Sequence, residues 1–319
     1  MFGGWGNPDH DDSVRIIQRA VDEGINFIDT ADVYSAGESE EIVGKALGQI
    51  DRDRVVLATK VHGQMGEDAG NAGNSRRWIT MEVENSLRRL GTDWIDLYQI
   101  HRPDPSTEIE ETLGALTDLV RAGKIRYFGC STFPPHQVVE AHWASERLGL
   151  GRFVTEQPPY SILARGVEAE LLPVARKYGM GVIPWSPLAG GWLSGKFGAG
   201  KDNTSRRSER MPDRYDLSLP ENQAKLDAVT ELGKLADESG LSMIELALGF
   251  TLAHPAVTAP IIGPRTMEQL EQQLTATDHA LSADVLDRID EIVPPGTNLN
   301  TADQGWVAPA LSDSALRRR

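Results

Sequence analysis

Short apolar runs alternate along the chain with segments in which apolar residues recur three or four positions apart. The first such segment places Val14, Ile17 and Val21 on one face, and it ends at Gly24. Residues 25–28 then form a short, largely apolar run, which is typical of a buried parallel strand. The same pattern predicts strands at residues 25–28, 55–58, 95–100, 125–129, 154–157, 181–185 and 257–262. It predicts helices at residues 39–47, 79–90, 108–120, 137–148, 167–178, 221–238 and 242–253, and two more from about residues 266 and 284.

Strands that alternate with helices in this way indicate an α/β fold with a parallel sheet. Because the strands are apolar on both faces, they favour a closed (β/α)8 TIM barrel over an open sheet. Only seven strands are predicted, so the barrel is expected to lack its first strand or to have it truncated before Phe2. Either the barrel is open there, another segment fills the place, or the start of the chain was assigned late. A long polar loop at residues 194–220 interrupts the alternation, but no linker divides the chain, and a single barrel domain over residues 1–319 is expected.

The composition excludes several classes of partner. The 319 residues carry a net charge of −15, whereas nucleic acids and anionic membranes require a basic face. The single cysteine excludes an internal disulfide and favours a reducing compartment. No apolar run reaches membrane-spanning length, and no signal peptide is recognised. A cytoplasmic protein without nucleic-acid or membrane partners is predicted, and its oligomeric state is left open.

Three successive predicted strands end in polar residues of different chemistry. Asp29, Lys60 and His101 follow the first three strands, and Tyr34 lies in the loop after the first. In a closed barrel the carboxyl ends of neighbouring strands face one mouth, where barrel enzymes carry out their chemistry. An ammonium next to a tyrosine favours the phenolate and lowers the phenol pKa from about 10. A carboxylate would hold the ammonium, and a neutral histidine would donate a hydrogen bond to a carbonyl oxygen.

Each of these residues also has an ordinary structural interpretation. Asp29 can cap the next helix, Lys60 can be a surface lysine, His101 can be a rim histidine with its hydrogen bonds satisfied, and Tyr34 can be a packing residue. All four at strand ends in this order favour function instead. The constellation is a proton donor adjusted for a carbonyl, and it requires a hydride source.

The sequence resembles the aldo-keto reductase superfamily, in particular its bacterial branch related to potassium-channel β subunits. The motifs that carry the resemblance occur in order over nearly the whole chain, at residues 26–40 (NFIDTADVYSAGESE), 57–60 (LATK), 90–101 (LGTDWIDLYQIH), 185–196 (WSPLAGGWLSGK) and 261–270 (IIGPRTMEQL). The resemblance implies that Tyr34 is the general acid, with Lys60, Asp29 and His101 in the roles argued above. It also implies that NADPH/NADP+ is the cofactor, bound in the barrel mouth without a Rossmann domain, and that the substrate is a small carbonyl compound.

The resemblance further implies a set of cofactor contacts. Ser131, Thr132 and Gln157 would bind the nicotinamide carboxamide or its surroundings, although many relatives have asparagine where Thr132 stands. Trp185 would stack on the nicotinamide ring. The alternative interpretation of Trp185 is that it packs inward at a strand end. The pyrophosphate would lie along Ser186, Pro187, Leu188, Gly190 and Gly191, where missing side chains permit close approach. Positive charge would come from Lys196 and Arg206. The alternative interpretation of Arg206 is a solvated loop charge, and Arg207 can substitute for it.

A second anion site is predicted between the last strand and the helix that follows it. Gly263 and Arg265 lie at a helix N-terminus, which favours anions, at the place where barrels commonly bind phosphate. Arg265 is the candidate for the 2′-phosphate and would favour NADPH over NADH. Gln269, Gln272 and Gln273 would contact the adenine or the ribose, the last of them at a position where relatives often have asparagine.

Cys130 and His62 lie near the motifs and are interpreted separately. Cys130 is interpreted as a small buried residue at a strand end rather than as a redox centre, and His62 as a possible lining of the substrate pocket. The histidines show no metal-ligand spacing.

Three functions therefore compete at the level of sequence. They are an NADPH-dependent reductase of aldehydes or ketones, an NADPH-binding regulatory or partner subunit with little turnover, and a barrel whose cofactor binding is impaired by the missing strand. The physiological substrate cannot be identified from these residues.

Overall fold

The computed structural model describes residues 2–198, 200–201, 208, 211–278 and 280–318. The contacts between its residues divide the chain into two compact units, each described by itself. The first comprises Met1–Gln157, Val174–Gly181 and Ile262–Leu274, and the second comprises Pro158–Pro173, Val182–Ile261 and Thr275–Arg319. The four residues of the predicted proton-donor constellation all belong to the first unit.

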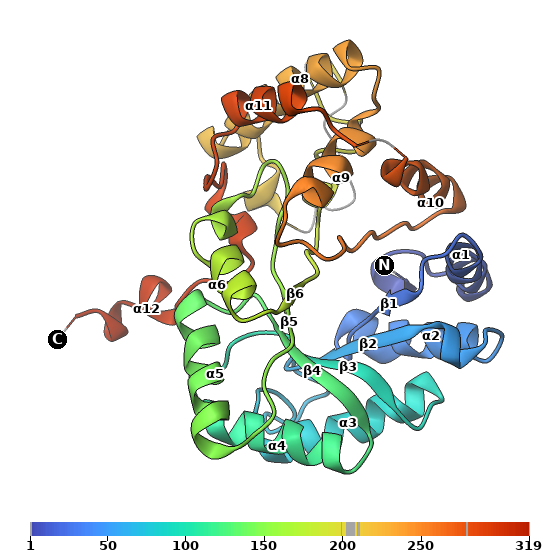
Figure 1. Cartoon of the computed structure of the whole chain (residues 1–319), viewed down its shortest axis with the longest axis vertical. Helices are drawn as coiled ribbons and strands as arrows, with labels where there is room; N and C mark the ends of the chain where they lie inside the picture. Colours follow the sequence, from blue (N-terminus) through green and yellow to red (C-terminus); the bar gives the residue numbers. More distant parts are fainter. Residues whose placement is uncertain (1, 199, 202–207, 209–210, 279, 319) are drawn as a thin grey trace. The chain divides into compact units, whose positions relative to one another are not determined.

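A parallel sheet whose strands pair in chain order is the main feature of the fold (Figure 1). Its strands are β1 (Phe27–Asp29), β2 (Val56–Val61), β3 (Ile95–Ile100), β4 (Ile125–Ser131), β5 (Thr155–Gln157) and β6 (Gly181–Val182). β3 is buried at five of its six positions, as expected for a parallel strand covered on both faces. The predicted α/β class with a parallel sheet is confirmed, and closure into eight strands stays a prediction.

Helices follow the strands as the periodicity predicts. They are α1 (His10–Asp22), α2 (Glu38–Leu47), α3 (Arg76–Leu90), α4 (Ile109–Arg121), α5 (Pro135–Leu148), α6 (Leu171–Lys177), α8 (Pro220–Glu238), α9 (Met243–Ala253), α10 (Met267–Leu274), α11 (Ala283–Ile292) and α12 (Pro309–Ser312). Several begin at side-chain caps: Asp9 caps α1, Ser75 caps α3, and Ser242 forms a capping box with Glu245 at α9. No helix in the described ranges has both the length and the apolar content needed to cross a membrane.

The register of the strands brings their carboxyl ends to one edge of the sheet. Lys60 of β2 lies opposite Gln99 of β3, and Ser131 of β4 lies opposite Gln157 of β5. Because side chains alternate between the faces of a strand, opposite residues in a parallel pair point to the same face. The sheet therefore collects these polar side chains on one face near its carboxyl edge.

Two sequence predictions of strands are wrong in extent. Residues 257–262 form no strand and make only an isolated bridge, between Val182 and Val257. The predicted strand at residues 181–185 is reduced to Gly181–Val182. Both segments contain a proline, Pro184 and Pro260, which has no backbone N–H to donate to a ladder. Hydrogen bonds join the two segments, from Thr258 N to Val182 O and from Ile261 N to Pro184 O, without a continuous ladder.

Candidate active site

The amine of Lys60 is surrounded by oxygen atoms from the end of β1 and the loop after it. Lys60 Nζ donates to Asp29 Oδ2 at 2.5 Å, to the Thr30 carbonyl oxygen at 2.8 Å and to Tyr34 Oη at 3.4 Å. The side chain of Lys60 is fully buried, and that of Asp29 is only 7% exposed. A single ammonium thus links a carboxylate to a phenol inside the first unit.

His101, the residue after β3, lies against the same tyrosine. The rings of Tyr34 and His101 meet edge to face, with centroids 5.6 Å apart and an interplanar angle of 77°. Trp5 approaches Tyr34 from the N-terminal segment, with 6.3 Å between ring centroids. The structure therefore brings together all four residues of the predicted constellation and adds Trp5, which the sequence reasoning missed because it precedes the first recognisable element.

Burial and charge set the ionisation of the two nitrogen bases. Burial opposes the charge on Lys60, but the neighbouring Asp29 carboxylate and Tyr34 oxygen outweigh it and raise the pKa of the amine. Burial, followed by the positive charges of Lys60 and Arg102, holds the pKa of His101 well below its usual range. At neutral pH this site therefore contains a charged lysine and an uncharged histidine.

Two side-chain amides hold the second oxygen of Asp29. Gln99 Nε2 donates to Asp29 Oδ1 at 3.2 Å, and Gln157 Nε2 donates to the same oxygen at 2.9 Å. Gln157 is thus engaged with Asp29 here, although the sequence predicted it as a contact of the nicotinamide carboxamide. The sequence reasoning missed Gln99, although an amide near the end of a strand predicted to be buried needs hydrogen-bond partners, and that position was the available signal.

Ser131 and Thr132 end β4 beside Gln157. Ser131 Oγ donates to the Gln157 carbonyl oxygen at 2.8 Å, and the Thr132 N–H donates to the same oxygen at 3.2 Å. Arg102 Nη1 reaches Ser131 Oγ at 3.4 Å and the His101 carbonyl oxygen at 2.5 Å. The three predicted nicotinamide contacts of the first unit are therefore neighbours, and Arg102 joins them to His101.

The segment before α10 holds the predicted 2′-phosphate residues. Arg265 is half-buried; its N–H donates to Gln269 Oε1 at 2.9 Å, and its carbonyl oxygen accepts from Asn7 Nδ2 at 3.0 Å. Gln273 is 7% exposed, and its side-chain oxygen has no hydrogen-bond partner in the described part of the chain. Gly263 is exposed with no atom within 4 Å of where a Cβ would stand, and Gln272 is exposed on α10. A buried acceptor without a partner on α10 and an arginine just before that helix offer a contact for an N–H or O–H donor and one for an anion.

The second unit contains the predicted stacking residue and the predicted pyrophosphate segment. Trp185 is half-buried, and its N–H donates to the Pro158 carbonyl oxygen at 2.9 Å. The residues that follow include Pro187, which is buried, and Leu188, which is half-buried. Left-handed backbone occurs repeatedly in this segment, at Ser186 (φ 61°), Ala189 (φ 48°), Gly190 (φ 71°) and Gly191 (φ 111°). Such strained backbone persists only where its surroundings hold it.

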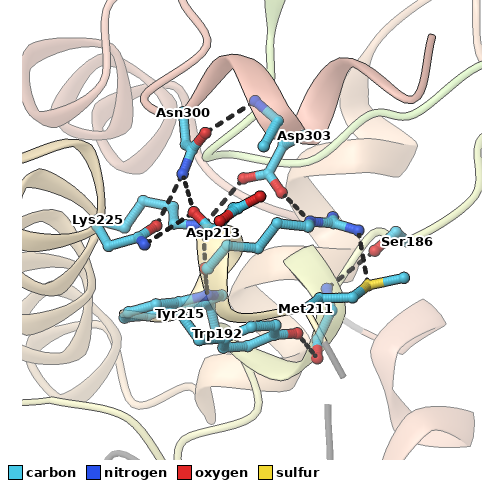
Figure 2. A network of polar contacts seen from close by, with 12 residues as sticks. Ser186, Trp192, Met211, Asp213, Tyr215, Lys225, Asn300 and Asp303 are labelled. Carbon is cyan, nitrogen blue, oxygen red and sulfur yellow. Dashed lines mark hydrogen bonds and ion pairs between the residues drawn. The ribbon is translucent and has the colours of Figure 1, made fainter. Parts of the chain in front are cut away.

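Figure 2 shows the polar network that holds this segment. Tyr215 Oη donates to the Gly190 carbonyl oxygen at 2.9 Å, and Gly190 N–H donates to Ser186 Oγ at 2.9 Å. Asp303 in turn accepts from Arg214 Nε at 2.5 Å and from Lys225 Nζ at 3.0 Å (Figure 2). The sequence reasoning missed this network, because its members come from three distant segments with no shared motif.

The sequence predicts two cationic cofactor contacts in the segment that follows, Lys196 and Arg206. Lys196 is exposed. Arg206 lies outside the described residues, as does its alternative Arg207.

Comparisons with known proteins support the interpretation of these motifs. The profile described as the Aldo/keto reductase family matches residues 1–294. An uncharacterized oxidoreductase, YrpG of Bacillus subtilis, is 40% identical over 300 residues, covering 90% of this chain and 89% of that protein. A putative voltage-gated potassium channel subunit beta of Schizosaccharomyces pombe is 37% identical, covering 92% of this chain and 88% of that protein. Versiconal hemiacetal acetate reductase of Aspergillus parasiticus is 32% identical, covering 92% of each chain.

The similarity extends over almost the whole chain and includes relatives that are named as oxidoreductases. It confirms the resemblance inferred from the motifs around Asp29, Lys60 and His101 and supports an oxidoreductase activity. The chain belongs to the aldo/keto reductase family.

Proposed function

We propose that this protein is an NADPH-dependent reductase that converts aldehydes or ketones to alcohols. The observation that carries the proposal is the position of Lys60 Nζ, which lies 2.5 Å from Asp29 Oδ2 and 3.4 Å from Tyr34 Oη. A phenol whose oxygen lies next to an ammonium can donate its proton, and the reduction of a carbonyl requires a proton donor. NADPH, when bound, supplies the hydride.

Residues of the first unit supply the proton, stabilise the phenolate and orient the substrate. Tyr34 donates the proton to the substrate oxygen, and the charged Lys60 stabilises the phenolate that this leaves. Neutral His101 donates a hydrogen bond to the same substrate oxygen and thereby orients it. Asp29 keeps Lys60 charged and in place, and the amides of Gln99 and Gln157 keep Asp29 in place.

The finer features belong to the same proposal. The proposal includes a single (β/α)8 barrel domain over residues 1–319 and a cytoplasmic location. Ser131, Thr132 and Gln157 take the nicotinamide end of NADPH, with Trp185 stacked on its ring. The segment from Ser186 to Gly191 takes the pyrophosphate together with Lys196 and Arg206. The residues from Gly263 to Gln273 take the adenosine 2′-phosphate end.

A second candidate function is an NADPH-binding partner subunit with little turnover. It is favoured by the relatives named as potassium channel subunits beta, which include proteins of Schizosaccharomyces pombe and Arabidopsis thaliana that are 37% and 35% identical to this chain. Steady-state NADPH oxidation with a panel of aldehydes and ketones separates the two functions. The reductase gives turnover above the blank with at least one carbonyl. Tight NADPH binding without turnover on the whole panel would support the subunit, and no NADPH binding at all would contradict both.

The choice between the two cofactors is expected to depend on Arg265. Changing Arg265 to alanine should raise the Kd of NADPH by about 10- to 100-fold, because a hydrogen bond to a charged group contributes about 1.5–3 kcal/mol. The Kd of NADH should change less than about 2-fold, since NADH lacks the 2′-phosphate. Fluorescence titration of both cofactors measures the two effects.

Arg19→Ala is a matched control for this prediction. Arg19 on α1 also lies beside α10, where its Nε is 2.8 Å from Glu271 Oε1, and it has no proposed cofactor contact. This variant should leave the ratio of the two Kd values unchanged. An equal loss of affinity for NADPH and NADH in Arg265→Ala would contradict the phosphate role.

A further inference from the structure

Glu156 is a fully buried carboxylate directly behind the proposed nicotinamide contacts. It lies on β5 opposite Cys130 of β4, one residue before the opposite pair Ser131 and Gln157. Because side chains alternate along a strand, Glu156 points away from the face that carries Gln157. It therefore makes no contact with a cofactor on that face and acts, if at all, through its neighbours.

The carboxylate holds the turn that follows β4. Glu156 Oε1 accepts the Phe133 N–H at 3.3 Å, next to Thr132, whose own N–H donates to the Gln157 carbonyl oxygen at 3.2 Å. Thr132 has left-handed backbone with φ 60°, a conformation that is costly for a β-branched residue. The hydrogen bonds of the Thr132 N–H to the Gln157 carbonyl oxygen and of the Phe133 N–H to the Glu156 carboxylate offset that cost. The turn that presents Ser131 and Thr132 thus depends on Glu156 for its conformation.

The other carboxylate oxygen has a thiol partner. Cys130 Sγ lies 2.8 Å from Glu156 Oε2. Burial, followed by the negative charge of Glu156, raises the pKa of the Cys130 thiol well above its usual range. The thiol is therefore protonated at neutral pH and donates its S–H to the carboxylate.

We propose that Glu156 is a positioning residue whose ionised carboxylate holds the turn at Ser131–Phe133 in the conformation that binds the nicotinamide, so that cofactor affinity follows the ionisation of this buried group. The inference rests on the proposed function, because the ligand of the turn is NADPH. It assigns to Glu156 a control over affinity rather than a step of the reaction.

Glu156 changes its ionisation near neutral pH, where NADPH binding takes place. Burial raises its pKa to about 7, against the hydrogen bonds from Cys130 and Phe133 and the charge of Arg102, which lower it. The titratable and charged groups that face it are Cys130 on β4 and Arg102 after β3. Above pH 7 the carboxylate is ionised and accepts the Phe133 N–H strongly. Below pH 7 it is protonated, and the turn is held less firmly.

The test is the Kd of NADPH, measured by fluorescence titration of the full chain between pH 5.5 and pH 9. For the unaltered protein, the Kd is expected to rise on the order of 5-fold as the pH falls through about 7, because a hydrogen bond to a charged group exceeds a neutral one by about 1 kcal/mol. Glu156→Gln should give the weaker Kd at every pH, since its amide cannot ionise. An unchanged pH dependence in this variant, or a flat profile in the unaltered protein, would overturn the inference.

Two substitutions at Cys130 move the midpoint in opposite directions. Cys130→Ser supplies a stronger donor than a thiol and should shift the midpoint to lower pH. Cys130→Ala removes the donor and should shift it to higher pH. A merely structural role of Glu156 would not move the midpoint in either variant, and that result would contradict the proposal. These variants keep the test decisive if Glu156→Gln fails to fold.

Two controls isolate the carboxyl of Glu156. A phosphate monoester titrates near pH 6, so each profile is repeated with NADH, which should show the same midpoint. Glu140→Gln, an exposed carboxyl on α5, should retain the full pH dependence. Failure of every variant and of the unaltered protein to bind NADPH at any pH would overturn the proposed function and this inference together. Normal binding without the midpoint would overturn this inference alone.

Discussion

Replacement of Tyr34 by phenylalanine is expected to lower kcat for carbonyl reduction by about 10³-fold, the usual contribution of a positioned general acid. The phenol is the group that Lys60 Nζ approaches at 3.4 Å and that the His101 ring meets edge to face. Removing only its oxygen leaves the ring in place against His101. The Kd of NADPH should therefore change by less than about 3-fold, a difference below 1 kcal/mol. NADPH oxidation measures kcat, and fluorescence titration measures the Kd.

Tyr98→Phe is the matched control for this variant. Tyr98 of β3 is also a fully buried tyrosine of the first unit, and its hydroxyl has no hydrogen-bond partner among the described residues. Losing that hydroxyl should leave kcat within about 2-fold, because no partner loses a hydrogen bond. Retention of activity in Tyr34→Phe would show that another group protonates the substrate, whereas equal losses in both variants would indicate general damage to the unit.

The alternation of elements in the first unit is predictable from the sequence because each strand and helix carries its own periodicity. Strand β3 coincides with the predicted residues 95–100, and its apolar positions alone suffice for that prediction. The segment at residues 257–262 shows the limit of this reasoning. Its apolar pattern predicts a buried strand, but none of residues 257–262 is buried, and Pro260 has no N–H to donate to a ladder.

The candidate site is predictable to the extent that its residues stand at strand ends. Asp29, Lys60 and His101 each follow an apolar run, so their approach to one another follows from the parallel sheet. Their supporting contacts do not follow from it. The bond from Gln157 to Asp29 joins β5 to β1, and the pairing of Cys130 with Glu156 depends on register between β4 and β5. No spacing in the sequence indicates either of these two contacts.

Buried charge is the common physical feature of this site, and it has opposite consequences at its two carboxylates. Asp29 lies 2.5 Å from the ammonium of Lys60, and that charge is compensated directly. Among the described residues, Glu156 accepts from the Cys130 S–H and the Phe133 N–H and has no ion pair, and burial raises its pKa to about 7. Asp29 is therefore held in an ion pair, whereas the ionisation of Glu156 changes near neutral pH. Removing the partner of Asp29 should be the more damaging change.

Changing Lys60 to methionine is expected to destabilise the protein by about 3–5 kcal/mol, the usual cost of leaving a buried charge without its partner. Methionine fills a similar volume, so lost packing contributes little. Of its donors in the described part of the chain, the Asp29 carboxylate would then keep the amides of Gln99 and Gln157. Carbonyl reduction should also be lost, because nothing would stabilise the phenolate of Tyr34. Urea denaturation followed by circular dichroism measures the stability, and NADPH oxidation measures the activity.

The double variant Asp29→Asn, Lys60→Met separates these two effects. It removes both charges together, and the asparagine oxygen can still accept from Gln157, so the double variant should recover more than half of the stability lost in Lys60→Met. Its activity should stay as low as that of Lys60→Met, because the ammonium is still absent. Recovery of activity along with stability would show that Lys60 acts on the fold alone. A double variant as unstable as the single one would show instead that the uncompensated Asp29 charge is not the cause of the instability.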